Sequence, residues 1–230
     1  MASKLDAVID KVQKLLNVAN SSDKPGEVAA AQLLAQQLIT KYQLEEAQLH
    51  GNIRSGEITS KNVPISEPYS IDKATLLNSI AIPNFCKVLR GDGYCVIYGF
   101  ESDIELCLAL YHVLELHMVT EMQAKLAIVR QSSSERIQTK PWAKSFFSGY
   151  ALNIGLRIKQ AKSNVVKEAG SSGASLELVL RDKQHAIEEF WQQVDREKGY
   201  KRKLSSTSAY QAGMQSAANA DLNQTKIESE

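Results

Sequence analysis

The sequence predicts a mostly helical α+β protein: a helical hairpin at the N-terminus, followed by a small antiparallel sheet of about three strands that long helices cover. Three observations support this fold class. Apolar residues recur every three or four positions over several long stretches, which is typical of amphipathic helices. Two runs rich in β-branched and aromatic residues flank Gly91-Asp92-Gly93 and predict a β-hairpin. The alternating run at residues 176–180 predicts a third strand, since an isolated two-stranded ribbon is only marginally stable.

The composition is that of an ordinary globular protein. The 230 residues are 43% hydrophobic and 23% charged, which excludes wholesale disorder, and no apolar stretch is long enough to span a membrane. Lys+Arg 27 against Asp+Glu 26 leaves a net charge of +1, so any surface for an anionic partner has to be local. Three cysteines, an odd number, argue against a disulfide framework. The first residues lack the apolar core of a signal peptide, so we expect a cytoplasmic location and no membrane partner.

The N-terminal part of the chain is expected to be helical. Apolar spacing predicts one helix over residues 5–19, a polar break ends it, and an Ala- and Leu-rich stretch predicts a second helix over 28–42. Two helices joined by a short loop form a hairpin whose apolar stripes pack on each other or on another surface. Residues 59–65 then predict a short strand, which Pro64 confines to a sheet edge, and a modest helix follows over 70–81.

The rest of the chain combines the β-hairpin with further helices. Ser102 and Glu105 match a capping box and predict the start of a long helix near residue 103, which runs to about residue 130. Pro141 predicts the start of another helix, which ends near residue 168. Amphipathic spacing predicts the last helices over 181–197 and 209–222. We divide the chain into a helical hairpin (1–49), an α+β domain (50–206), and a short C-terminal helix with a polar tail (207–230).

The N-terminal hairpin also has a distinctive sequence pattern. It contains Lys11-Val12-Gln13-Lys14-Leu15-Leu16-Asn17-Val18-Ala19, then Pro25-Gly26-Glu27, and later Leu38-Ile39-Thr40-Lys41-Tyr42-Gln43-Leu44. Over residues 5–49 this pattern resembles the DUF2786 family, and the remainder resembles the uncharacterised domain that usually accompanies it. The resemblance implies a bacterial or phage protein. It implies no activity and no catalytic residues.

Candidate metal ligands and nucleophiles are few. Cys86, Cys95 and Cys107 are widely spaced in the sequence. His112 and His117 are five residues apart, so on a helix they point about 140° away from each other and do not converge on a metal. We therefore interpret the cysteines as buried, small hydrophobic residues and expect no metal and no cofactor. The sequence has no G-x-S-x-G motif, and nothing in it places Cys95 beside either histidine as a catalytic dyad.

Two other motifs fit structural roles better than catalytic ones. Gly91-Asp92-Gly93 lies between two strands, whereas a phosphate-binding loop precedes a helix. Glu101, Asp103 and Glu105 cluster at the start of the long predicted helix, where each carboxylate stabilises the helix by about 0.3–1 kcal/mol through the helix dipole. A hydrolase that uses these carboxylates therefore ranks last among the functions that we consider.

Basic residues gather in two segments. Residues 138–168 carry six Lys and Arg against one Glu, and residues 196–203 carry five against one, which gives net charges of +5 and +4. Residues 101–121, in contrast, hold five carboxylates and no basic residue. Four lysines of the first segment fall within an arc of about 100° on a helix, and Tyr200 lies among cations where it can stack on a base. The predicted nucleic-acid-binding residues are Lys140, Lys144, Lys159, Lys162, Tyr200, Lys201, Arg202 and Lys203.

These basic segments favour a non-enzymatic accessory protein that contacts the phosphate backbone of DNA or RNA. Lysine outnumbers arginine 19 to 8, and base readout favours arginine, so we expect salt-sensitive binding with weak sequence specificity. A charged helix face is often merely solvated, which keeps an alternative open. In that alternative, the N-terminal helix pair (residues 1–49) is a protein–protein interaction module that acts, for example, on a host complex.

Overall fold

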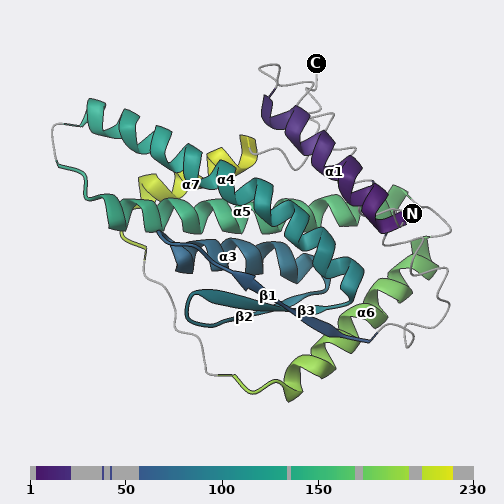
Figure 1. Cartoon of the computed structure of the whole chain (residues 1–230). Helices are drawn as coiled ribbons and strands as arrows, with labels where there is room; N and C mark the ends of the chain where they lie inside the picture. Colours follow the sequence, from purple (N-terminus) through teal and green to yellow (C-terminus); the bar gives the residue numbers. More distant parts are fainter. Residues whose placement is uncertain are drawn as a thin grey trace.

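The computed structural model describes residues 4–21, 38, 42, 57–133, 136–168, 173–196 and 204–219. In this part of the chain it has six α-helices and a three-stranded antiparallel sheet (Figure 1), which confirms the predicted α+β, mostly helical fold. The helices are α1 (Lys4–Ser21), α3 (Ser70–Ala81), α4 (Glu101–Ser132), α5 (Thr139–Glu168), α6 (Gly173–Gln193) and α7 (Thr207–Asn219), and η2 (Ile82–Asn84) is a 3-10 turn. The strands are β1 (Thr59–Pro64), β2 (Lys87–Arg90) and β3 (Tyr94–Gly99).

The sheet has the order β1-β3-β2, with β3 in the centre. β2 and β3 form the predicted hairpin, and Gly93 in its turn has a φ of 74°, which glycine adopts without steric strain. β1 pairs antiparallel with the other side of β3, from Thr59 opposite Gly99 to Pro64 opposite Tyr94. Pro64 therefore lies at the end of an edge strand, as its missing N–H predicts.

The third strand of the sheet is β1, which matches the short edge strand predicted over residues 59–65, and not the run at residues 176–180. Residues 176–180 belong to α6, so the prediction of a strand there is wrong. The run is short, and Leu176, Val179 and Leu180 also follow the spacing of a helix, so its alternation does not distinguish the two structures. β1 and β2 occupy both sides of the central strand, which completes the sheet without residues 176–180.

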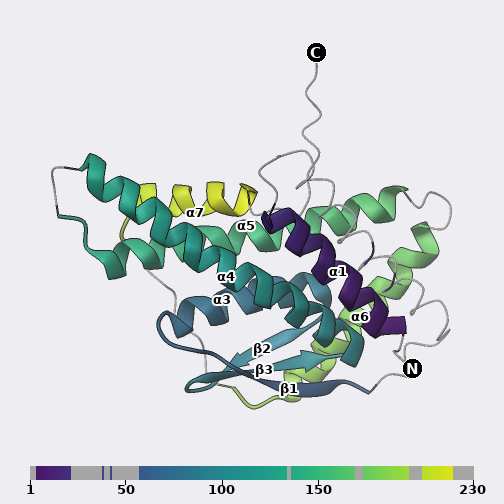
Figure 2. The same cartoon turned by 45° about the horizontal axis from the view of Figure 1, so that its top comes forward.

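The helices form layers above one face of the sheet. Figure 2 shows the sheet at the bottom, α3 and α4 above it, and α5 with α7 farther out. α1 packs on α4, and α6 runs past one end of the sheet. None of the described helices is both long enough and apolar enough to cross a lipid bilayer. The largest fully buried side chains lie where these layers meet: Leu76, Leu77, Ile80, Ile97, Ile104, Leu106, Leu110, Tyr111, Phe146, Phe147 and Tyr150.

α4 begins differently from the sequence prediction. The residue before its first turn is Phe100, and no side chain caps the helix there, so the predicted capping box of Ser102 and Glu105 is wrong. Ser102 lies within the first turn and is buried, and Glu105 pairs with Lys61 on β1. The first turn still carries two carboxylates, Glu101 and Asp103, which favour the positive end of the helix dipole.

α7 packs along α5 more closely than side chains normally allow. A Cβ atom on Gly213 would lie 1.9 Å from the carbonyl oxygen of Phe146, and one on Gly149 would lie 2.1 Å from that of Tyr210. Polar groups of α5 also bind the α7 backbone: Asn153 donates to the carbonyl of Met214 (2.6 Å), and the buried Arg157 donates to that of Ala217. The two glycines therefore permit a backbone-to-backbone contact that fixes the C-terminal helix.

The N-terminal hairpin is described only in part. α1 matches the first predicted helix, and its Val8 and Val12 are buried in the core that α4 contributes to. Most of the second predicted helix lies outside the described residues, except Leu38 and Tyr42, which are helical and half-buried against the same core. Val8 and Val12 of the predicted apolar stripe thus pack within this chain, while Leu5, Ile9 and Leu15 are half-buried.

Candidate functional site

The helical hairpin of α4 and α5 ends in a basic tip, which we define as Lys125, Arg130, Arg136, Lys140 and Lys144. The turn that joins the two helices lies at the far left of the molecule in Figure 1. Arg130, near the end of α4, donates a hydrogen bond to Thr139 Oγ1 at the start of α5, which holds the two helix ends together. Arg130, Arg136 and Lys140 are exposed, and the other two side chains are half-buried.

Acidic groups are scarce around this tip. Residues 122–167 contain nine Lys and Arg and a single acid, Glu135, which lies outside the described residues. Lysines elsewhere form ion pairs between elements, such as Lys61 with Glu105 (2.5 Å) and Lys87 with Glu188 (2.6 Å). Within the described ranges, no cation of the basic tip is paired with a carboxylate. The tip therefore presents positive charge that its own chain leaves largely uncompensated.

The segment that follows the second basic run is fixed to the same end of the molecule. Ser145 Oγ accepts hydrogen bonds from the backbone N–H groups of Ser205 (3.2 Å) and Ser206 (3.1 Å). Ser205 Oγ in turn donates to the carbonyl of Pro141 (2.9 Å). The predicted binding residues Tyr200, Lys201, Arg202 and Lys203 lie outside the described residues. The chain that leaves this run at Leu204 therefore reaches the first turns of α5 beside Lys140 and Lys144.

The four lysines predicted on α5 do not share one solvent-facing stripe. Lys140 and Lys144 belong to the basic tip, and Lys159 is exposed but roughly 28 Å farther along the helix axis. Lys162 is buried, with 8% of its surface exposed, so its prediction as a phosphate contact is wrong. Lys162 lies over the ring of Phe85, which directly follows η2, whereas Lys140 and Lys159 are exposed.

Lys162 instead belongs to a buried charge cluster, which we define as Asp103, Lys162 and Lys183 with the ring of Phe85. Lys183 on α6 pairs with the fully buried carboxylate of Asp103 on α4 at 2.7 Å. The ammonium groups of Lys162 and Lys183 lie 4.4 Å and 6.0 Å from the centre of the Phe85 ring. Lys162 Nζ has no hydrogen-bond partner within the described part of the chain. Burial lowers the pKa of Lys162 to about 8, while the nearby Asp103 opposes this shift.

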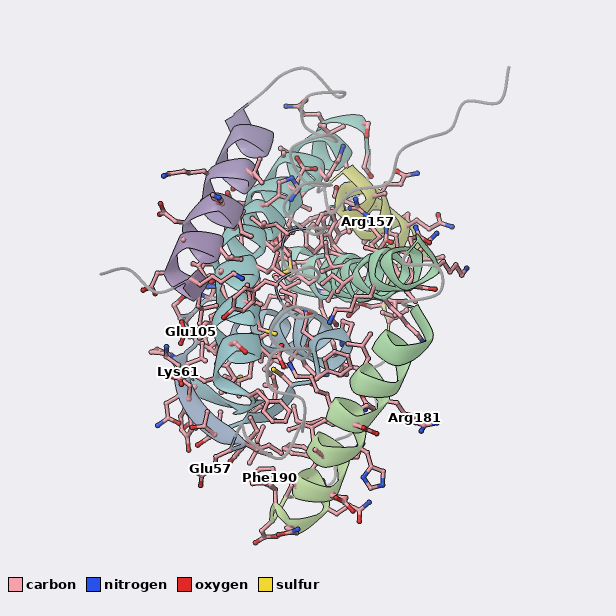
Figure 3. All side chains as sticks on the ribbon, turned by 90° about the vertical axis from the view of Figure 1, so that its right-hand side faces the viewer. Glu57, Lys61, Glu105, Arg157, Arg181 and Phe190 are labelled. Carbon is pink, nitrogen blue, oxygen red and sulfur yellow. The ribbon has the colours of Figure 1, made fainter. Side chains whose placement is uncertain are left out.

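The candidate catalytic carboxylates do not converge. Asp103 belongs to the buried charge cluster, Glu105 pairs with Lys61, and Glu101 is exposed. Figure 3 shows Lys61 and Glu105 together at one edge of the sheet. They border a shallow groove of about 400 Å³ between α1, β1 and α4. Its apolar lining includes Ile9 and Leu108, and no second carboxylate lies beside Glu105 there, among the described residues, to act as its acid–base partner.

The three cysteines are buried, as the sequence predicts. Cys86, Cys95 and Cys107 are all buried and form no disulfide. Burial raises the pKa of Cys95 to about 11, and the pKa of Cys86 is raised by its contact with the Cys107 thiol and by burial. His117 Nδ1 forms a hydrogen bond with the Tyr150 hydroxyl at 2.9 Å, whereas His112 is exposed beside the groove. Among the described residues, no three His, Cys, Asp or Glu side chains are grouped to hold a metal ion.

Comparison with known proteins identifies the N-terminal region. Residues 7–46 match the model of the DUF2786 family, which is described as a protein of unknown function. No curated protein and no solved structure matches the chain. The DUF2786 segment includes most of α1 and ends before β1, so the basic tip and the buried charge cluster both lie outside it.

Sequence inspection missed part of each cluster. Lys125, Arg130 and Arg136 precede the basic segment that we counted, and a charge count carried across the loop between the two long helices finds them. The ion pair of Asp103 with Lys183 joins residues 80 positions apart, and neither residue type nor spacing indicates it. In addition, the sequence does not distinguish a buried lysine in a basic helix from an exposed one.

Proposed function

We propose that this DUF2786 protein binds nucleic acid in the cytoplasm, through contacts of the basic tip with the phosphate backbone. The observation that carries this proposal is the accumulation of five cations at the end of the α4–α5 hairpin, none of which forms an ion pair with a carboxylate among the described residues. Phosphate groups are the partners that such an unpaired lysine and arginine surface attracts most strongly. Because the cations lie on helix ends, and lysines predominate, the contacts fix position on the backbone without selecting a base sequence.

The second basic run extends this surface in our proposal. Lys201, Arg202 and Lys203 directly precede Leu204, and the hydrogen bonds of Ser205 and Ser206 to Ser145 hold the following segment at the first turns of α5. These three cations thus directly precede, in the sequence, a segment that is hydrogen-bonded to α5 beside Lys144. Lys159 and the buried Lys162 are not part of this surface, which instead includes the cations at the end of α4.

Binding is tested by fluorescence anisotropy with labelled duplex DNA, single-stranded DNA and RNA over a series of KCl concentrations. If the five cations of the basic tip each neutralise one phosphate, the logarithm of the association constant falls by about 4 to 5 for a tenfold increase in salt. Affinity should depend little on base sequence. Binding that does not change with salt, or no binding even at low salt, would contradict the proposal.

A charge-matched pair of variants distinguishes the basic tip from general electrostatic attraction. The test variant removes three tip cations, Arg136→Ala, Lys140→Ala and Lys144→Ala, and should reduce the salt dependence by about three contacts and weaken binding at least tenfold. The control variant removes three exposed cations from α1, the end of β2 and α6: Lys11→Ala, Arg90→Ala and Arg181→Ala. Equal losses in the two variants would show that the tip has no special role.

A further inference from the structure

α6 is held against the rest of the protein by a small number of specific contacts. Figure 3 shows α6 along one side of the molecule, with Phe190 beside the sheet. Near the C-terminal end of α6, the Phe190 and Trp191 rings lie 5.8 Å and 5.9 Å from that of Tyr98 on β3. In its middle, Glu188 accepts the ammonium group of Lys87 on β2 at 2.6 Å. A further polar contact is the pair of Lys183 with Asp103, in which both side chains are buried.

The buried charge cluster offers one carboxylate to two ammonium groups. Lys183 takes the Asp103 carboxylate, whereas Lys162, which lies over the Phe85 ring, has no hydrogen-bond partner among the described residues and feels Asp103 only as a nearby charge. A buried ammonium group without an acceptor is strongly disfavoured relative to one that is paired or hydrated. An arrangement in which Lys162 takes over Asp103 removes this cost, but Lys183 must then leave the carboxylate, and Lys183 is part of α6.

We propose that Lys162 and Lys183 compete for Asp103, and that the transfer of Asp103 to Lys162 releases α6 from the sheet. In the docked form, Lys183 is paired with Asp103 and α6 packs beside the sheet. In the released form, Lys183 is hydrated, Lys162 is paired with Asp103, and the Tyr98 ring and the contact face of Phe190 are exposed. α6 is then a detachable element whose docking is set by the protonation of an adjacent lysine.

The direction of the pH dependence follows from the groups that face Lys162. Asp103 and Cys107 face it from α4, Cys86 from the segment before β2, and Lys183 from α6. Because the pKa of Cys86 is raised, this thiol stays neutral, and Asp103 supplies the negative charge. In the docked form the pKa of Lys162 is lowered to about 8, whereas in the released form it returns toward the ordinary value of about 10.4. The released form therefore binds the proton more tightly, and docking strengthens about tenfold per pH unit between these two values.

Hydrogen exchange of the whole chain, followed by mass spectrometry from pH 7 to 10, tests this competition. After correction for the intrinsic exchange rate, the protection of α6 amides should rise about tenfold per pH unit above pH 8, while the protection of α5 amides changes little. In Lys162→Met, which keeps the volume but cannot pair with Asp103, α6 should be protected to the same degree at every pH. Lys159→Met, an exposed lysine one turn earlier on α5, is the matched control and should behave as the wild type.

A second variant separates competition from a merely structural role. Lys183→Met removes the docking partner and leaves Asp103 to Lys162, so α6 should lose protection at least tenfold while α4 and α5 keep theirs. Simultaneous loss of protection in all three helices would show that the cluster simply stabilises the core, and would overturn the proposal. The same conclusion follows if Lys162→Met retains the wild-type pH dependence of α6.

Discussion

Replacing Gly213 with alanine tests the backbone contact between α5 and α7. In an exposed helix this change stabilises by about 1 kcal/mol, because alanine has the higher helix propensity. Here the new Cβ would lie 1.9 Å from the carbonyl oxygen of Phe146, well inside van der Waals contact, and this oxygen belongs to the α5 backbone. The two helices must separate by more than 1 Å, and overpacking of this kind costs about 1–3 kcal/mol. Separation also weakens the dispersion contacts of the buried Ala209 and Ala217.

We therefore expect Gly213→Ala to lower the free energy of unfolding by about 2 kcal/mol, in spite of its better helix propensity. Urea unfolding followed by far-ultraviolet circular dichroism measures this change, and hydrogen exchange shows whether α7 is the region that opens. Gln211→Ala, an exposed position on the same helix, is the matched control and should leave stability within about 0.5 kcal/mol of the wild type. A Gly213→Ala protein as stable as the wild type, or more stable, would refute the close contact.

Two further predictions concern thiols and acid stability. The three cysteines should not react with an aromatic disulfide reagent at pH 7.5 in the native protein, because burial shields them and the pKa values of Cys86 and Cys95 are raised. All three, Cys86, Cys95 and Cys107, should react once the protein is unfolded. Fast reaction of any one of them in the native protein would contradict this prediction. Burial lowers the pKa of His117 below 6.5, so the unfolded chain binds the proton first and stability should fall as the pH drops from about 6.5 toward the pKa of the folded state. His117→Phe should flatten this part of the stability–pH curve, and an unchanged slope would assign the effect to other groups.

The helices were largely predictable because periodic apolar spacing is a local property. Residues 70–81 match α3, and the β2–β3 hairpin follows from its turn and its β-branched runs. The start of α6 was misassigned because a short alternating run satisfies both periods, and only the packing of the whole segment selects one. The capping box failed for a similar reason: Ser102 and Glu105 have the right spacing, but the helix begins one residue before Ser102.

For the basic surface, too, the sequence predicted local charge but not which residues are buried. Charge counts along the chain predicted a positive region that includes Lys140 and Lys144, which are exposed and half-buried at the start of α5. The charge counts could not distinguish these two lysines from the buried Lys162, because the same face of α5 packs against η2 and the Phe85 ring farther along the helix. Arg130 entered the basic tip only through the turn that brings the end of α4 beside the start of α5.

The amino-acid sequence by itself determined the fold class, most of the helices, the β-hairpin and the similarity of residues 7–46 to the DUF2786 family. Each of these depends on residues that are close together in the chain, and local conformational preference acts over that distance. Only the tertiary structure decided which lysines face solvent and that Asp103 pairs with Lys183. Burial and charge pairing are set by what packs across a helix face, and residues far apart in the sequence supply that packing.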